Sequence, residues 1–146
     1  MATETEPRAP RETHRLYVHV AWTTLARVPV IPPERCAAIE THMMAACRQL
    51  GAEPVEARAL VDRIHLIVRL PVVASVAAVA KGVRAEVAER LERSGRVVRW
   101  SPGFAAVTIT PADVRRARKR LAAFEDPAVT PRDRGRAGGA ADPPGG

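Results

Sequence analysis

The residues of this chain whose types and spacing suit chemistry lie in the run LVDRIHLIVRLP, residues 60–71. Asp62, Arg63 and His65 combine a carboxylate, a permanent cation and an imidazole, which are groups that bind metals or phosphates. Side chains alternate between the two faces of a strand, so Arg63, His65 and Arg69 point to one side. Ile64, Leu66, Val68 and Leu70 point to the other side, and Ile67 shares the face of the three polar residues. The run therefore predicts a core strand with a basic outer face.

A second strand, predicted over RLYVHVAWTT at 15–24, places Tyr17 and His19 on an outer face of the same kind. A sheet face that combines a tyrosine with arginine and histidine is similar to the platforms of single-stranded nucleic-acid binders, where rings stack on bases and cations contact phosphates. The alternative is an ordinary polar, solvated sheet face. The apolar residues of this strand are expected in the core: Leu16, Val18, Val20 and Trp22.

The other elements must hold these two strands side by side. Proline at the start and Gly51 at the end bound a helix, and Gly95 ends a second one. The order of elements is βαββαβ followed by one extra helix, which is an α+β, ferredoxin-like arrangement. Its four-stranded antiparallel sheet has the first and third strands in the middle, with two helices on one face and the other face open. The predicted ranges are strands at 15–24, 52–61, 63–71 and 97–110, the last interrupted by Pro102 and Gly103, and helices at 32–51, 73–95 and 111–126.

The length of 146 residues suits one domain, which we expect over residues 15–126. Proline, glycine and charge dominate residues 1–14 and 127–146, and neither segment has an apolar periodicity, so a disordered arm and a disordered tail are expected. No apolar run approaches the roughly 20 residues of a membrane span, and the first residues do not form an export signal. These features predict a cytoplasmic protein without a membrane partner.

The formal net charge of +7 favours a polyanionic partner such as nucleic acid, because lysine and arginine release the counterions condensed on phosphates. Cys36 and Cys47 fall in one predicted helix, which separates them by about 16 Å at the rise of a helix. They are therefore not expected to pair with each other.

Several segments in order resemble one family, the insertion-sequence-two-hundred-like single-tyrosine transposases of the HUH type, which include the repeat-associated tyrosine transposases. The resemblance spans about residues 15 to 121. It depends on HVAWTT (19–24), LGAEPVEARALVDRIHLIVRLP (50–71), AKG (80–82), WSPGF (100–104), and VTIT (107–110) before a helix that begins VRR.

The resemblance implies a defined chemistry. In the family, two histidines at i and i+2 of the third strand bind a divalent metal, Mg or Mn, which polarises a DNA phosphate. A tyrosine on the last helix attacks that phosphate, and a glutamine four residues later completes the metal shell. Family members act as dimers on hairpin ends of single-stranded DNA.

The family pattern transfers only in part. Asp62 and His65 match it, but Arg63 stands where the first histidine would be. Ala117 stands at the tyrosine position and Leu121 at the glutamine position. Tyr17 is the only tyrosine of the chain and belongs to the first strand, where the resemblance offers no nucleophile. Arg63, His65, Ala117 and Leu121 therefore mark a vestigial site in this interpretation.

We therefore expect a transposase-like protein that binds DNA but has lost strand cleavage, with no catalytic residue and no cofactor. No metal is expected, and His65 and His19 are the only candidate ligands. The expected partners are single-stranded or hairpin DNA and a second copy of the chain. The predicted nucleic-acid contacts are Tyr17, His19, Arg63, His65, Arg69, Lys81, Arg84, Arg115 and Arg116.

Each of these roles has an alternative. Arg63 is expected to bind a phosphate through two N–H groups, or else is a neutral replacement. Lys81 and Arg84 contact the nucleic-acid backbone, or belong to a solvated helix face. The last helix has one apolar stripe, which we expect to pack on its own sheet or on that of a partner. That stripe consists of Val114, Ala117, Leu121 and Phe124.

Three further functions stay open from the sequence. The same sheet platform suits RNA, so an RNA-binding or regulatory module is one alternative. A purely dimerising interaction domain is another. An active transposase requires that another nucleophile replace the tyrosine.

Overall fold

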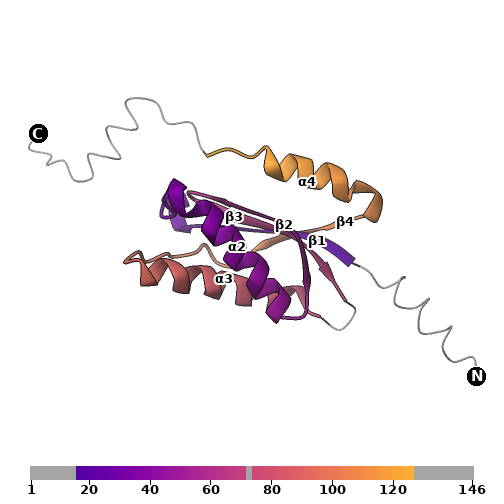
Figure 1. Ribbon diagram of the computed structural model, residues 1–146, viewed down its shortest axis with the longest axis horizontal. Coiled ribbons are helices and arrows are strands. Elements are labelled where there is room, and N and C mark those ends of the chain that lie inside the picture. Colours follow the sequence, from indigo (N-terminus) through magenta and orange to yellow (C-terminus); the bar gives the residue numbers. More distant parts are fainter. Residues whose placement is uncertain (1–15, 72–73, 127–146) are drawn as a thin grey trace, which may run out of the picture.

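The computed structural model describes residues 16–71 and 74–126, so the predictions for residues 1–14 and 127–146 lie outside the described residues. Four strands form one antiparallel sheet in the order β2-β3-β1-β4. Their bounds are β1 Leu16–Thr23, β2 Glu53–Leu60, β3 Arg63–Leu70 and β4 Ala105–Ile109. The predicted α+β, ferredoxin-like fold is confirmed, and β1 and β3 lie in the middle of the sheet (Figure 1).

The core forms because the apolar residues of β1 and β3 alternate in step. Antiparallel pairing sets Val20 opposite Leu66 and Trp22 opposite Ile64, and all four are at most 2% exposed. They share one core cluster with residues of the helices α2, Cys36–Gln49, and α3, Val76–Arg93, which cover one face of the sheet (Figure 1). Burial of such side chains is the dominant stabilising contribution in a domain of this size.

Local signals define the ends of both helices. The Ser75 hydroxyl oxygen accepts a hydrogen bond from the Ala78 N–H at the start of α3, as N-cap serines do. Gly51 and Gly95 follow α2 and α3 with φ of 83° and 86°, a region that glycine enters without steric cost. The predicted helix ends at these glycines are confirmed. The apolar spacing of the 32–51 segment also predicts a buried stripe of Ile39, Met43, Ala46 and Leu50. The first three are buried, but Leu50 is 41% exposed and Cys47 is buried instead.

The helix α3 continues through Gly82, in the middle of the predicted 73–95 segment. A Cβ atom at this position would lie 2.5 Å from Leu50 Cδ1, so the missing side chain allows α2 and α3 to approach closely. Glycine lowers helix propensity, and here the packing of the two helices outweighs that cost.

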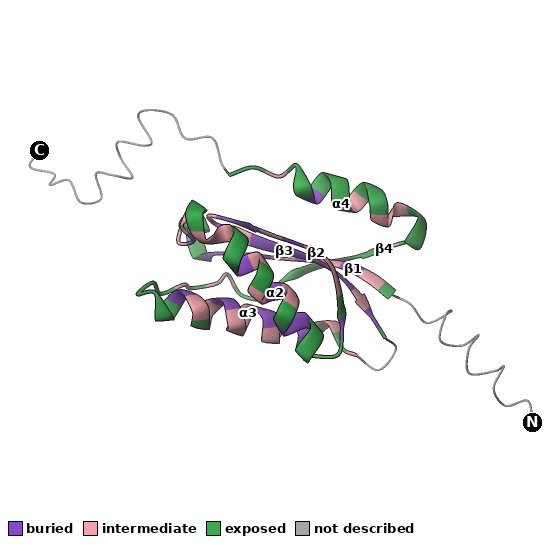
Figure 2. Cartoon of the chain, viewed as in Figure 1, coloured by how far each residue is buried: buried purple, intermediate pink, exposed green. Residues whose placement is uncertain are grey.

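The sequence predicted that the second face of the sheet is open, and this prediction is wrong. The helix α4, Val114–Ala122, lies over that face, on the opposite side from α2 and α3 (Figure 1). Leu121 is fully buried, Val114, Ala117 and Phe124 are half-buried, and the rest of the helix is exposed (Figure 2). The predicted apolar stripe is therefore confirmed, and it packs on the sheet of its own chain.

Two predicted ranges were too long. The strand expected at 97–110 is reduced to β4 at Ala105–Ile109, with a separate bridge between Thr24 and Trp100. The predicted interruption at Pro102 and Gly103 is therefore present, and Gly103 has a φ of 74° there, but the residues before it form no strand of their own. The last helix ends at Ala122 rather than at residue 126, and a 3-10 turn, Pro111–Asp113, precedes it. Among residues 16–71 and 74–126, no helix is both long enough and apolar enough for a membrane span.

Candidate functional site

The two histidines of the central strands meet on the α4 side of the sheet. The register of β1 and β3 sets His19 opposite Ile67 and Ala21 opposite His65, so the two imidazoles are diagonal neighbours. His19 Nε2 lies 3.0 Å from His65 Nδ1, and their ring centroids are 5.2 Å apart. One of these two nitrogens carries a hydrogen and donates a hydrogen bond to the other. This hydrogen bond therefore requires that the other of the two nitrogens carry no proton.

Both rings favour the neutral form. Burial lowers the pKa of His65 to about 4, and the nearby charges of His19, Arg63 and Arg27 act in the same direction. Burial, followed by the charge of Arg120, also lowers the pKa of His19. At neutral pH the pair is therefore uncharged and shares one hydrogen bond. His65 Nε2 is buried and has no hydrogen-bond partner among the described residues.

The segment 124–126, which follows α4, covers His65. The Phe124 ring packs on the His65 ring with 4.7 Å between centroids. Arg58 donates a hydrogen bond to the Phe124 carbonyl, and Arg63 donates one of 3.1 Å to the Glu125 carbonyl. Both cations thus meet carbonyls just beyond the C-terminal end of α4, where positive charge is favourable. His65 retains only 8% of its exposure.

Asp62 binds two arginine side chains next to this region. Its side chain is 4% exposed and binds two guanidinium groups, Arg63 through Oδ1 at 2.9 Å and Arg27 through Oδ2 at 3.0 Å. The Arg63 side chain is 18% exposed and also lies 5.9 Å from the centre of the Phe124 ring. Arg63 is therefore engaged within the chain, and a phosphate would have to displace the Glu125 carbonyl or approach from the solvent side.

The residues present do not fit the divalent metal that the family resemblance implies. Two imidazole nitrogens supply half of a four-ligand shell at most. Within residues 16–71 and 74–126, no three His, Cys, Asp or Glu side chains are placed to hold an ion. Asp62 is occupied by two arginines, and Arg63 and Arg27 oppose a further positive charge.

The other predicted contacts on the sheet lie further along the same face. Tyr17 is half-buried on β1, opposite Arg69 of β3 and Ile109 of β4. Arg69 forms an ion pair with Glu53 at the far end of β2. Lys81 and Arg84 belong to α3, on the opposite side of the sheet from α4 (Figure 1). The structure therefore divides the predicted contact residues between two sides of the molecule.

Helix α4 presents its cations to solvent because Leu121 and its half-buried neighbours occupy the face toward the sheet. Arg118 pairs with Glu56 of β2 at 3.2 Å, and Arg116 lies 3.6 Å from Asp113. Exposed pairs of this kind contribute little to stability. We call the outer cations the α4 basic face, and its residues, all exposed, are Arg115, Arg116, Arg118, Lys119 and Arg120.

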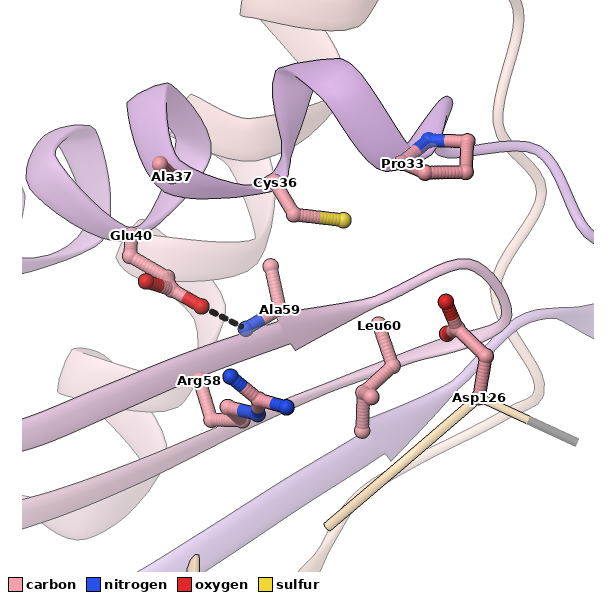
Figure 3. Close-up of a pocket in the computed structure, with 8 residues that line it drawn as sticks. All are labelled: Pro33, Cys36, Ala37, Glu40, Arg58, Ala59, Leu60 and Asp126. Atoms are coloured by element: carbon pink, nitrogen blue, oxygen red, sulfur yellow. Dashed lines mark hydrogen bonds between the residues drawn. The ribbon is translucent and has the colours of Figure 1, made fainter. Parts of the chain in front are cut away.

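A pocket of about 310 Å³ lies at the β2 edge of the sheet, beside the N-terminal end of α2. Figure 3 shows the Glu40 carboxylate reaching the Ala59 N–H, at 2.8 Å, and Asp126 beside the same edge. Asp126 accepts a hydrogen bond of 2.8 Å from the Val61 N–H. Glu40 thus caps a backbone donor of the edge strand β2, and Asp126 caps one in the turn that follows it, which protects this edge against pairing.

The Cys36 thiol in this pocket does not suit a nucleophile. Burial, together with Asp126 and Glu40, raises its pKa to about 11, so the thiolate is scarce at neutral pH. Cys36 belongs to α2, on the side of the sheet opposite His65 (Figure 1). Cys36 and Cys47 are both free, as the helical spacing predicted.

Sequence reasoning missed three residues that shape this region: Arg27, Arg58 and Phe124. Arg58 stands directly opposite His65 in the β2–β3 register, which the hairpin pattern alone could have indicated. Phe124 was assigned to the packing stripe, but its position over His65 depends on where α4 docks. Arg27 lies in a loop without any motif, and only the three-dimensional contacts reveal it.

Comparison with known proteins places these features in a family. The model of the family described as "Transposase IS200 like" matches residues 12–119. No curated protein matches the chain significantly.

Two solved structures share the fold. One is a candidate transposase from Deinococcus radiodurans R1, with 17% identity over 77% of this chain and 93% of that chain, and a TM-score of 0.59. The other is a REP-associated tyrosine transposase bound to a REP hairpin, with 13% identity over 74% of this chain and 64% of that chain, and a TM-score of 0.55. Since the family match covers most of its length, this chain belongs to the IS200-like transposase family.

Proposed function

We propose that this member of the family binds single-stranded or hairpin DNA and does not cleave it. The observation that carries the proposal is the apolar and aromatic cover over His65. Phe124 packs on the imidazole, and Leu121 is fully buried where the resemblance implies a metal-binding glutamine. Ala117 replaces the nucleophile, and Arg63 replaces a metal ligand. Binding therefore needs no divalent metal in this proposal.

The proposed DNA contacts begin with the α4 basic face, because its guanidinium and ammonium groups are exposed. Arg115 and Arg116 contact phosphates there, and Tyr17, His19 and Arg69 extend the surface along the sheet. Arg63 and His65 take part only when the segment 124–126 moves away. Lys81 and Arg84, on the other side, contact a strand that wraps around the domain. The solved relative with a bound hairpin supports this choice of partner. The expected compartment is the cytoplasm.

Titration of a labelled DNA hairpin with a single-stranded extension tests the binding, across a salt series. We expect log affinity to fall linearly with log salt, with a slope near −0.7 for each single-strand phosphate neutralised. Replacing Arg115 and Arg116 by alanine is expected to weaken binding and reduce that slope. A matched RNA hairpin that binds more tightly would favour the RNA-binding alternative. Absence of salt-sensitive binding to either would favour the interaction domain.

We also propose that two copies associate through the β4 edge. Ala105, Ala106, Val107 and Thr108 are all exposed, and Val107 is 63% exposed. At the opposite edge, Glu40 caps β2 and Asp126 caps the turn after it, and a register shift between Pro54 and Glu56 interrupts the pairing of β2 with β3. An uncapped edge strand is a template for pairing, so β4 is the edge that suits a second sheet.

Light scattering after size exclusion checks this association. Val107→Lys is expected to convert the dimer to a monomer, since a charge in the middle of an edge strand opposes pairing. Val97→Lys is the matched control, because Val97 is 70% exposed and lies outside the sheet. A monomeric natural chain, or a dimer that persists in Val107→Lys, would disprove the arrangement.

A further inference from the structure

The segment that follows β1 has an unusual backbone. Ala26 and Arg27 both have a φ of 57°, in the left-handed region, and neither is glycine. A Cβ atom in this conformation crowds the neighbouring carbonyl, so residues other than glycine enter it at a steric cost. Two such residues in succession persist only where the surrounding structure fixes them, and strain of this kind gathers at functional sites.

The contacts that fix this segment come from two directions. The Thr24 N–H donates to the Asp62 carbonyl at 3.0 Å, and the Thr24 hydroxyl donates to the Val28 carbonyl at 2.8 Å. The Leu25 N–H donates to the Arg99 carbonyl at 2.8 Å. The loop is therefore tied to the β2–β3 turn on one side and to the segment before β4 on the other. Its position, and that of the Arg27 side chain, is set before any ligand binds.

The Arg27 guanidinium is oriented by a buried acid. Its Nε and Nη2 both lie 3.0 Å from Asp62 Oδ2, while the other Asp62 oxygen binds Arg63. One carboxylate thus serves two guanidinium groups, and the cluster keeps one net positive charge. The Arg27 side chain is 54% exposed. Arginine has five N–H donors, so about three remain beyond the two on Asp62.

Stability alone does not account for this arrangement. An ion pair with a half-exposed partner contributes little to folding, because solvent screens it. It does not by itself explain two strained residues that hold the guanidinium in place. A preoriented, partly exposed guanidinium suits an anion with several oxygens, which it binds through paired N–H groups.

We propose that Arg27 is a phosphate-contact residue that binds a backbone phosphodiester of the DNA beside the His65 region. The assignment rests on the proposed DNA binding and adds a contact from the loop after β1. Asp62 acts as a positioning residue, since it fixes the orientation of the Arg27 guanidinium and offsets one of the two positive charges of Arg27 and Arg63. Asp62 links Arg27 to Arg63, and Arg63 lies 5.9 Å from the centre of the Phe124 ring that packs on His65, so the contact borders the His65 region.

The test is hairpin-DNA binding by Arg27→Gly and Arg27→Lys across a salt series. Glycine accepts the left-handed backbone, so Arg27→Gly removes the side chain without adding strain. We expect about a five- to ten-fold loss of affinity and a salt slope that is smaller by about 0.7, the effect of one single-strand phosphate contact. Arg27→Lys retains the positive charge but not the paired N–H donors of the guanidinium. The salt slope should therefore equal that of the natural chain, and the loss of affinity should be smaller than in Arg27→Gly.

Arg93→Ala is the matched control, because Arg93 is 62% exposed, pairs with Glu89 of its own helix α3, and makes no contact with Asp62 among the described residues. It is expected to bind as the natural chain does. If the natural chain binds no DNA, the proposed function fails and this inference fails with it. If it binds, and Arg27→Gly matches it in affinity and slope, only the role of Arg27 is overturned. An equal loss of affinity in Arg93→Ala would mean that only the net charge matters, and it would also overturn the role of Arg27.

Discussion

Replacing Leu121 by alanine is expected to lower the free energy of unfolding by about 2–5 kcal/mol, the range for truncating a buried leucine. Leu121 is fully buried, and it is the one residue of α4 that is buried in this way. The exposed ion pair between Arg118 and Glu56 cannot compensate for its loss. Urea or guanidinium denaturation followed by circular dichroism measures the change.

Lys119→Ala is the control on the same helix, since Lys119 is exposed, and a change within about 0.5 kcal/mol is expected for it. Leu121→Gln, which restores the residue that the family resemblance implies, is expected to destabilise as well, because a buried amide there needs new hydrogen-bond partners. A loss below about 1 kcal/mol in Leu121→Ala would mean that α4 does not depend on this contact.

Acidification from pH 6.5 to 4 is expected to remove about 3 kcal/mol of stability through His65 alone. Burial holds the pKa of His65 at about 4, against 6.5 in an unfolded chain. Between these values the unfolded chain binds a proton that the folded chain does not, so lowering the pH favours unfolding. The difference of about 2.5 pH units corresponds to about 3 kcal/mol at 1.36 kcal/mol per unit. Below pH 4 this contribution falls no further.

Denaturation curves at several pH values, for the natural chain and for His65→Gln, isolate this contribution from that of the carboxylates. His42→Gln is the control, because His42 is a half-buried histidine of α2, on the other face of the sheet. The His65→Gln variant should lose much less stability on acidification, and the control should behave as the natural chain. Equal losses in all three would contradict a buried, neutral His65.

The fold was predictable because its signals are local. Alternation in β1 and β3, proline at helix starts, and Gly51 and Gly95 at helix ends are each readable within a few residues. The interruption of the 97–110 strand at Pro102 and Gly103 was also readable, whereas the reduction of its first part to a single Thr24–Trp100 bridge was not. The order of the sheet followed from the order of the elements, since the ferredoxin-like arrangement leaves few alternatives.

The site was predictable only in part. Alternation put His19 and His65 on one face, but their 3.0 Å contact depends on the register of β1 against β3. The stripe through Leu121 predicted that the last helix packs, but not that it covers His65 with Phe124. Arg27 had no signal at all, since nothing local in Thr24–Val28 predicts two left-handed residues. Long-range contacts, which no short pattern encodes, decided all three.

The proposal that the protein binds DNA without cleaving it is tested most directly by incubation with hairpin-ended single-stranded DNA and manganese, followed by a denaturing gel. We expect intact DNA and no covalent protein–DNA adduct, although a native gel of the same reaction should show a complex. A covalent adduct or a cleaved strand that is lost when His65 is replaced by alanine would contradict it, because the chain would then supply a nucleophile of its own.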